Sequence, residues 1–169
     1  MCAGAGGHTG RYSPFGFVEE VRRFWSGPLV VAGAISSGRS VRAAEILGAD
    51  FVYAGTTFIS AAESMAAPAY KQMVVECGLG DVVSSAAVTG VMGSWLRPSL
   101  ERSGYTPEML EQKGKASFTG ASVDVKAWKN LWAAGHGVGS ATSIEPAADI
   151  VERLLAEYSA LARSELEPA

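Results

Sequence analysis

The sequence predicts an α/β fold built around two neighbouring parallel strands. Two short apolar runs, 29–32 and 51–54, are bounded by glycine, proline or aspartate, which is typical of buried strands. The segment between them, 39–47, carries apolar residues at helical spacing and ends at Gly48. A strand, a helix and a second strand in this order predict a right-handed crossover and therefore parallel strands. We expect both strands to be fully buried, with Phe51 and Tyr53 in the core.

A helix is predicted before the first strand, over 17–25. Its apolar residues recur on one helical face, and glutamates and arginines take the opposite face. This apolar face consists of Phe17, Val18, Val21, Phe24 and Trp25. Gly27 and Pro28 then end the helix.

Beyond residue 60 the pattern is less regular, with one clear exception near the C-terminus. There, apolar residues repeat at helical spacing after Pro146, which predicts a helix over 147–161. Between these regions we expect a helix over 68–77, an extended segment over 81–93, loops with one helical turn at 107–112 across 96–120, and a short helix within 128–139 that runs into a glycine-rich loop.

Composition limits the classes of function. The chain has 169 residues, 48% of them apolar and 18% charged, which fits one globular domain with a sizeable core. The net charge of −3 gives no basic surface for nucleic acid. No apolar run approaches the roughly 20 residues of a membrane span. Cys2 and Cys77 have no disulfide framework and no metal-ligand spacing, so we expect no metal and a reducing cytoplasm.

Glycines follow both predicted strands. Gly33 and the turn 36–38 come after the first strand, and Gly55 and Thr56 come after the second. Glycine lets the backbone approach a ligand closely, and the next helix N-terminus offers unpaired N–H groups to an anion. The pattern therefore indicates a phosphate site, while the alternative is that these glycines only permit tight turns.

Two histidines lie in further glycine-rich segments. His8 stands in AGGHTG, at the start of a loop that no strand precedes, and His136 stands in AAGHGVG. A histidine among glycines is not packed by its sequence neighbours, and a neutral imidazole suits a general base. The alternative for each is a surface histidine in a loop, and this alternative is stronger for His136.

Four segments in this order resemble the FMN-dependent nitronate monooxygenase family. They are AGGHTG at 5–10, VVAGAISSGR at 30–39, LGADFVYAGTTF at 47–58 followed by Glu63 and Ser64, and LWAAGHGVG at 131–139. The resemblance implies the C-terminal portion of a TIM (β/α)8 barrel, with 29–33 as strand 7, 51–54 as strand 8, and strands 1 to 6 absent. A complete barrel takes about 250 residues. We therefore expect a truncated member or fragment, divided into barrel units at 1–60, a helical or irregular insert at 61–140 and a C-terminal helix at 141–169.

The resemblance also implies the cofactor, the reaction and the site. FMN would contact Gly6, Gly33, Ala34, Tyr53, Ala54, Gly55 and Thr56. His8 would be the catalytic residue, as the base for nitroalkanes and a polar contact for the nitronate. An alkyl nitronate would be oxidised with O2 to a carbonyl compound and nitrite. Three positions depart from the family pattern: Ala34 replaces a common glycine, Thr57 a common arginine and His136 a frequent glutamine.

Two other functions remain open from the sequence. One is an FMN-dependent enoyl-acyl-carrier-protein reductase, whose barrel shares similar glycine-rich loops. The other is a non-catalytic fragment, or one half of an enzyme whose N-terminal half is encoded separately. Because the neighbours of both strands are missing, we expect the chain to form an oligomer or to need a partner.

Overall fold

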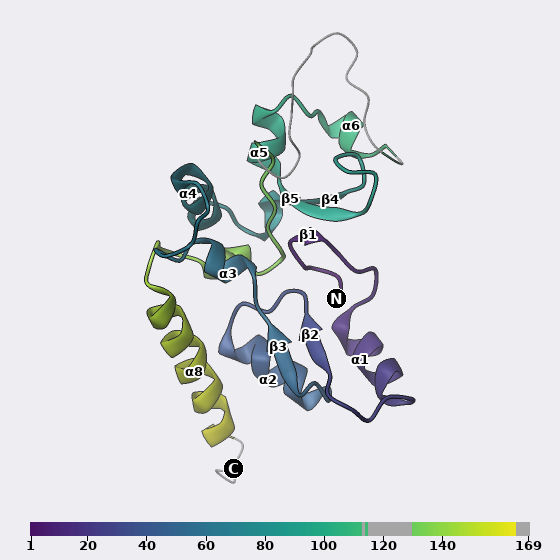
Figure 1. Cartoon of the computed structure of the whole chain (residues 1–169), viewed down its shortest axis with the longest axis vertical. Coiled ribbons are helices and arrows are strands. Elements are labelled where there is room, and N and C mark those ends of the chain that lie inside the picture. Colours follow the sequence, from purple (N-terminus) through teal and green to yellow (C-terminus); the bar gives the residue numbers. More distant parts are fainter. Residues whose placement is uncertain (113, 115–129, 165–169) are drawn as a thin grey trace.

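The computed structural model describes residues 1–112, 114 and 130–164, with side chains through Leu161. Helices and strands both occur, so the predicted α/β class is confirmed; the assignment to the last two strands of a barrel stays a prediction. A parallel pair of strands forms one part of the molecule together with helices α1 (Pro14–Arg22), α2 (Gly38–Ile46) and α8 (Ala147–Ser164) (Figure 1). An antiparallel sheet of β1 (Gly7–His8), β5 (Gly93–Leu96) and β4 (Val82–Ser85) forms the other part with α5 (Arg97–Arg102) and α6 (Pro107–Leu110), and its strand β1 lies nearest the parallel pair.

The predicted βαβ unit is present. Strand β2 (Val30–Ala32) pairs in parallel with β3 (Phe51–Tyr53), in the register Val30 to Phe51 and Ala32 to Tyr53. Helix α2 (Gly38–Ile46) connects them. Its first turn is fixed by Ser37, whose side chain accepts a hydrogen bond from the Ser40 backbone in a capping box.

Helix α1 is Pro14–Arg22, so it begins and ends three residues before the predicted bounds. Ser13 caps it and Pro14 occupies its first turn, where a missing N–H costs nothing. The predicted apolar face is wrong at both ends: Phe17 is 36% exposed, Phe24 77% and Trp25 48%. Just past the helix, the Arg22 side chain holds the following loop by donating to the carbonyls of Gly48 and Gly27.

One of the three apolar clusters in the described residues lies on one face of the parallel pair. Val31 and Val52 point toward Val18 of α1 and Ala44 of α2 in a single apolar cluster. Side chains alternate along a strand, so the neighbouring positions lie on the opposite face.

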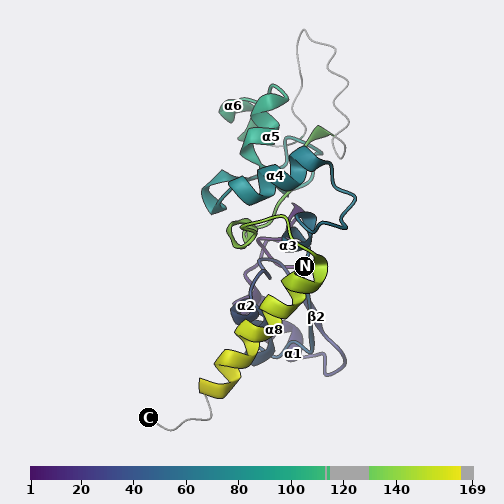
Figure 2. The same cartoon turned by 90° about the vertical axis from the view of Figure 1, so that its left-hand side faces the viewer.

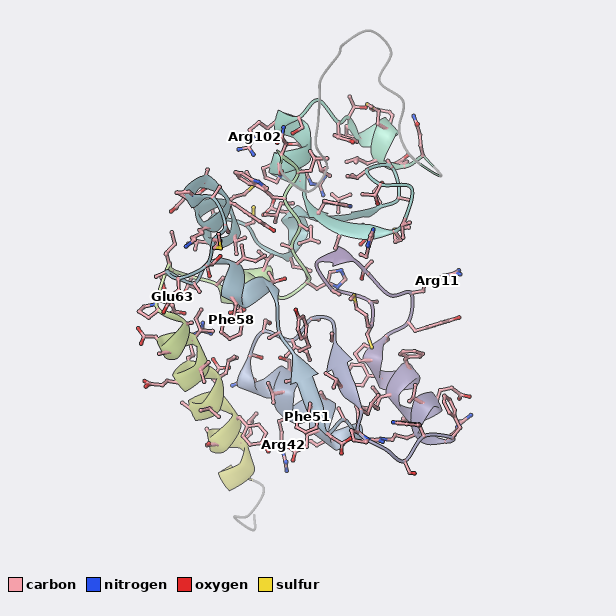
Figure 3. All side chains as sticks on the ribbon, in the orientation of Figure 1. Arg11, Arg42, Phe51, Phe58, Glu63 and Arg102 are labelled. Atoms are coloured by element: carbon pink, nitrogen blue, oxygen red, sulfur yellow. The ribbon has the colours of Figure 1, made fainter. Side chains whose placement is uncertain are left out.

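The opposite face is exposed, and the prediction of full burial is wrong there. Val30 is 55% exposed, Phe51 61% and Tyr53 67%. Phe51 lies at the end of β3 remote from α3 (Figure 3). We call Val30, Phe51 and Tyr53 the strand face. Helices cover only one side of the pair within the described residues, whereas the sequence pattern of these strands suits burial on both sides.

Asp50 fixes the start of the parallel pair. Its Oδ2 accepts from the Leu29 N–H at 2.7 Å and from Arg22 Nη2 at 2.6 Å. These hydrogen bonds, led by the Leu29 N–H, lower the pKa of the Asp50 carboxyl. The side chain thus joins α1, β2 and β3 at the edge away from the glycine-rich loops.

The second sheet was not predicted as such. Strand β5 (Gly93–Leu96) pairs antiparallel with both β4 (Val82–Ser85) and β1 (Gly7–His8). The expected extended segment 81–93 is therefore a hairpin whose second strand begins where the prediction ended. Residues 7–8, expected in a loop, become a strand because Gly7 and His8 find partners in Ser94 and Gly93.

The remaining helices agree in part with the prediction. Helix α4 (Pro68–Glu76), α6 (Pro107–Leu110) and the long α8 (Ala147–Ser164) lie where helices were expected. Helices α3 (Thr56–Ile59) and α5 (Arg97–Arg102) and the short 3-10 turns η1 (Leu79–Asp81) and η2 (Val138–Ser140) were not predicted. Of the helix expected within 128–139, residues 128 and 129 lie outside the described part.

Helix α8 packs along α2, as both views show (Figures 1 and 2). Glu63 caps its first turn by accepting from the Ala147 N–H at 2.9 Å. Across the described ranges, none of the helices has the length and apolar character to span a membrane.

Candidate functional site

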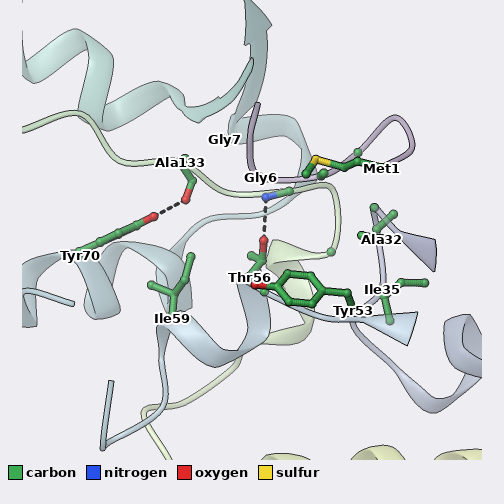
Figure 4. A pocket seen from close by; sticks show the side chains of 17 residues that line it. Met1, Gly6, Gly7, Ala32, Ile35, Tyr53, Thr56, Ile59, Tyr70 and Ala133 are labelled. Atoms are coloured by element: carbon green, nitrogen blue, oxygen red, sulfur yellow. Dashed lines mark hydrogen bonds between the residues drawn. The ribbon is translucent and has the colours of Figure 1, made fainter. Parts of the chain in front are cut away.

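A cavity of about 370 Å³ lies where the glycine-rich loops meet (Figure 4). It is bounded by the N-terminal loop, the ends of β2 and β3, helix α3 and the loop 133–137. Met1, Ala32 and Ile35 lie on one side, Ile59 and Tyr70 on the other, and Tyr53 and Thr56 between them. Seven lining residues are glycines, so backbone forms much of its wall: Gly4, Gly6, Gly7, Gly33, Gly55, Gly135 and Gly137.

Most of the predicted cofactor residues line this cavity together. They are Gly6, Gly33, Ala34, Tyr53, Gly55 and Thr56. Ala54 does not line it, because its side chain packs against the core cluster on the other face of β3. His8 is exposed on β1, one residue beyond the lining residue Gly7. His136 is exposed between the lining residues Gly135 and Gly137.

Three glycine-rich loops are joined at Gly4. Its carbonyl accepts from the Ala34 N–H at 3.2 Å and from the His136 N–H at 2.9 Å. A Cβ on Gly135 would overlap this same carbonyl oxygen. Gly4 and Gly135 therefore allow the backbones of these loops to pack closely. The clustering of glycine in the sequence is the feature that marks these loops.

Thr56 and Gly55 have separate roles beside the cavity. Thr56 Oγ1 accepts from the Gly135 N–H at 2.8 Å, which fixes the loop 133–137 against α3. A Cβ on Gly55 would meet no atom within 4 Å. The backbone of Gly55 is therefore bare toward open space, as close approach of a ligand requires.

Tyr70 forms a wall that sequence analysis missed. Its hydroxyl donates to the Ala133 carbonyl, and its ring stacks on Trp132 with centroids 5.1 Å apart. The Arg102 guanidinium lies 4.1 Å from the centroid of the Trp132 ring. Burial raises the pKa of Tyr70 to about 12, so the phenol is neutral at physiological pH. The predicted apolar face of 68–77 included Tyr70, but helical spacing carries no signal for a contact 63 residues away.

The two predicted anion loops differ in their free donors. Ser36 and Ser37 both donate their N–H groups to Ser40 Oγ at 3.0 Å. The turn 36–38 thus satisfies its donors within the protein, and none of its residues lines the cavity. Gly33, Gly55 and Thr56 line the cavity and are the remaining candidates for an anion, since the Ala34 N–H donates to the Gly4 carbonyl.

Thr57, one of the departures from the family pattern, does not reach the cavity. Its side chain is fully buried, and its hydroxyl has no hydrogen-bond partner in the described part of the chain. The threonine therefore places no charged group at the cavity.

Ala34 has a left-handed backbone with φ +57°. The side chain strains this conformation by about 1–2 kcal/mol, whereas glycine adopts it freely. We expect Ala34→Gly to raise the free energy of unfolding by up to about 1 kcal/mol, since part of the relief is offset by the greater freedom of the unfolded chain. Chemical denaturation of both proteins measures the change, with Ala32→Gly on β2 as a control that should destabilise. An Ala34→Gly protein less stable than the parent would contradict the strain.

The comparisons with known proteins identify the family of the chain. The nitronate monooxygenase family profile matches residues 3–157. The nitronate monooxygenase of Paraburkholderia phytofirmans is 26% identical over 167 residues, which are 89% of this chain and 45% of that protein. The nitronate monooxygenase of Pseudomonas aeruginosa is 42% identical over 77 residues, 40% of this chain and 22% of that protein.

Two solved structures share the fold of this chain. FabK from Thermotoga maritima superposes with a TM-score of 0.73 at 26% identity, covering 96% of this chain and 54% of that one. Nitroalkane oxidase from Streptomyces ansochromogenes gives 0.70 at 26% identity, covering 99% and 52%. This chain spans about half the length of these relatives or less. Since the family profile extends over nearly the whole chain, the chain belongs to the nitronate monooxygenase family.

Proposed function

We propose that this chain carries the flavin-binding loops of an FMN-dependent nitronate monooxygenase. The supporting observation is the glycine-lined cavity at the ends of two parallel strands, in a chain that belongs to this family. The reaction would oxidise an alkyl nitronate with O2 to a carbonyl compound and nitrite. The nitroalkane oxidase that superposes on 99% of the chain favours this substrate class.

The residues at the cavity fit a flavin mononucleotide. The cavity volume of about 370 Å³ lies within the range of small-molecule sites. The open space at Gly55 leaves room for a ligand beside the backbone. Gly33, Gly55 and Thr56 would hold the phosphate, and Ala34 would line the site beside them. Tyr53 and Tyr70 would offer apolar ring surface. When bound, the flavin would take up electrons from the nitronate and pass them to O2.

His8 is the proposed base for neutral nitroalkanes. It follows Gly7, which lines the cavity, and its exposed side chain is accessible to substrate. Tyr70 is unsuited to this role, because its phenol already donates to Ala133 and stays neutral. A substrate that arrives as a nitronate has already lost the proton that a base would remove.

The exposed strand face motivates the proposed partner. Val30, Phe51 and Tyr53 form an apolar surface, and Tyr53 also lines the cavity. We propose that an oligomer partner or a separately encoded N-terminal half covers this face, as the remainder of a barrel would. Both cysteines are free and buried, which suits the proposed reducing cytoplasm.

Titration with FMN tests the cofactor proposal. Because one side of the cavity is open, we expect the isolated chain to bind FMN weakly, and riboflavin more weakly still since it lacks the phosphate. Flavin fluorescence during titration measures both affinities. A protein purified with stoichiometric FMN would contradict the expected weak binding, and absence of any FMN binding would contradict the site.

Activity assays separate the three functions considered. A loaded chain, with its partner, should consume O2 and release nitrite from alkyl nitronates. Oxidation of reduced pyridine nucleotide by an enoyl thioester, without nitrite from nitronates, would instead identify an enoyl reductase. Neither activity in a flavin-loaded sample would identify a non-catalytic fragment.

A further inference from the structure

We propose that Arg102, on the surface of α5, is a positioning residue for the candidate site, because it holds the Tyr70 wall of the cavity through the ring of Trp132. Arg102 does not line the cavity itself. Its effect on the wall depends only on contacts within the chain, whereas the effect on flavin affinity rests on the proposed function.

Trp132 contacts both a surface cation and a side chain of the cavity. The Arg102 guanidinium lies 4.1 Å from the centroid of the Trp132 ring (Arg102 is labelled in Figure 3). The Tyr70 ring of α4 stacks on the same residue, with 5.1 Å between the ring centroids and 13° between the ring planes. The face of an indole attracts a cation, and stacked aromatic rings attract each other. The three side chains therefore form one continuous stack, which we call the Arg102 stack, and Tyr70 is its member that lines the cavity.

Helix α5 holds Trp132 at two points. The Trp132 N–H donates to Ser99 Oγ at 2.8 Å, and Ser99 lies three residues before Arg102 on the same helix. Residues at this spacing are neighbours on a helix surface. The Trp132 carbonyl accepts from the Leu96 N–H at 2.8 Å, and Trp132 is buried. Ser99 therefore fixes the backbone of Trp132, while Arg102 contacts its indole.

The Tyr70 ring is held at two points as well. Its hydroxyl donates to the Ala133 carbonyl, as Figure 4 shows, and Ala133 also lines the cavity. Its ring face lies against Trp132, the residue before Ala133 in the sequence. A wall that is already fixed loses less side-chain freedom when a ligand binds. We therefore expect the Arg102 stack to strengthen the binding of a planar ring system against Tyr70.

The charge of Arg102 offers a second route to the same effect, which is attraction of an anionic ligand at a distance. Arg97 provides the control for it, since it lies on the same helix, is also exposed and donates to the Gly80 carbonyl at 3.1 Å. Replacing either arginine by alanine changes the net charge equally, and the contact with Trp132 belongs to Arg102.

Titration of the full chain with FMN, followed by flavin fluorescence, tests the proposal. Arg102→Ala should raise the dissociation constant by about 3–10-fold, the range expected when a cation–π contact at a partly exposed site is lost. Arg102→Lys should restore most of the affinity, because an ammonium group also binds the face of an indole. Arg97→Ala should leave the dissociation constant nearly unchanged.

Two further measurements show whether Arg102 acts through Trp132. In a chain that carries Trp132→Leu, the Arg102→Ala change should add little, since the effects of residues in contact are not additive. Near-ultraviolet circular dichroism reports ordered aromatic rings and needs no flavin. Arg102→Ala should lower this signal, while Arg102→Lys and Arg97→Ala should keep it. This comparison decides the matter if the Trp132 variant does not fold.

Equal weakening of FMN binding by Arg102→Ala and Arg97→Ala would overturn the proposal in favour of general charge attraction. An Arg102→Ala chain with the near-ultraviolet signal and FMN affinity of the parent would also overturn it, as would full additivity with Trp132→Leu. A parent that binds no FMN, with a signal that Arg102→Ala lowers and Arg102→Lys restores, would support the hold on Tyr70 and count against the proposed function.

Discussion

Replacing His8 by alanine is expected to lower turnover of a neutral nitroalkane by about 10²–10⁴-fold, the usual contribution of a general base. Turnover of the preformed nitronate should fall far less, because that substrate needs no proton removed. The assay uses flavin-loaded protein together with the partner proposed to cover the strand face. Oxygen consumption and nitrite release give kcat/KM for each substrate.

His136→Ala is the matched control for this experiment. His136 is also exposed and next to lining residues, but it lies on the loop 133–137 and not on β1. It should leave the ratio between nitroalkane and nitronate unchanged. Equal losses on both substrates in the His8 variant would assign His8 to substrate binding instead of proton transfer.

The isolated chain is expected to associate through its strand face. Val30 and Phe51 are more than half exposed, and a contiguous apolar patch of this kind marks an interaction surface. The short edge of β3 also leaves backbone groups open to pairing with another strand. Phe51→Lys should weaken association by about tenfold or more, as loss of a buried aromatic anchor does. Size exclusion with light scattering over a range of concentrations measures the change.

Phe24→Lys controls for the removal of an exposed aromatic side chain. Phe24 is 77% exposed but follows α1, away from the strand face. It should leave the association nearly unchanged. A parent protein that remains a monomer and melts cooperatively would contradict both the strand-face interaction and the proposed need for a partner.

The sequence by itself determined the local elements and the family. The βαβ unit could be predicted because apolar residues at 29–32 and 51–54, and the capped helix between them, depend on contacts within a few residues. Gly33 and Gly55 could be predicted at the cavity because a glycine at the end of a strand permits close approach whatever its distant partners are. The family resemblance added Gly6, Ala34 and Tyr53, which line the same cavity.

Tertiary structure decided burial and the long-range contacts. An apolar strand pattern predicts that a face can be buried, but it does not predict which segment covers that face. The prediction that Phe51 and Tyr53 lie in the core was therefore wrong. Gly7 forms a strand only because Ser94 lies beside it. Likewise, Glu157 reaches Gly38 across 119 residues. Such pairings depend on how the chain closes on itself, and a periodicity of two or 3.6 residues carries no information about that closure.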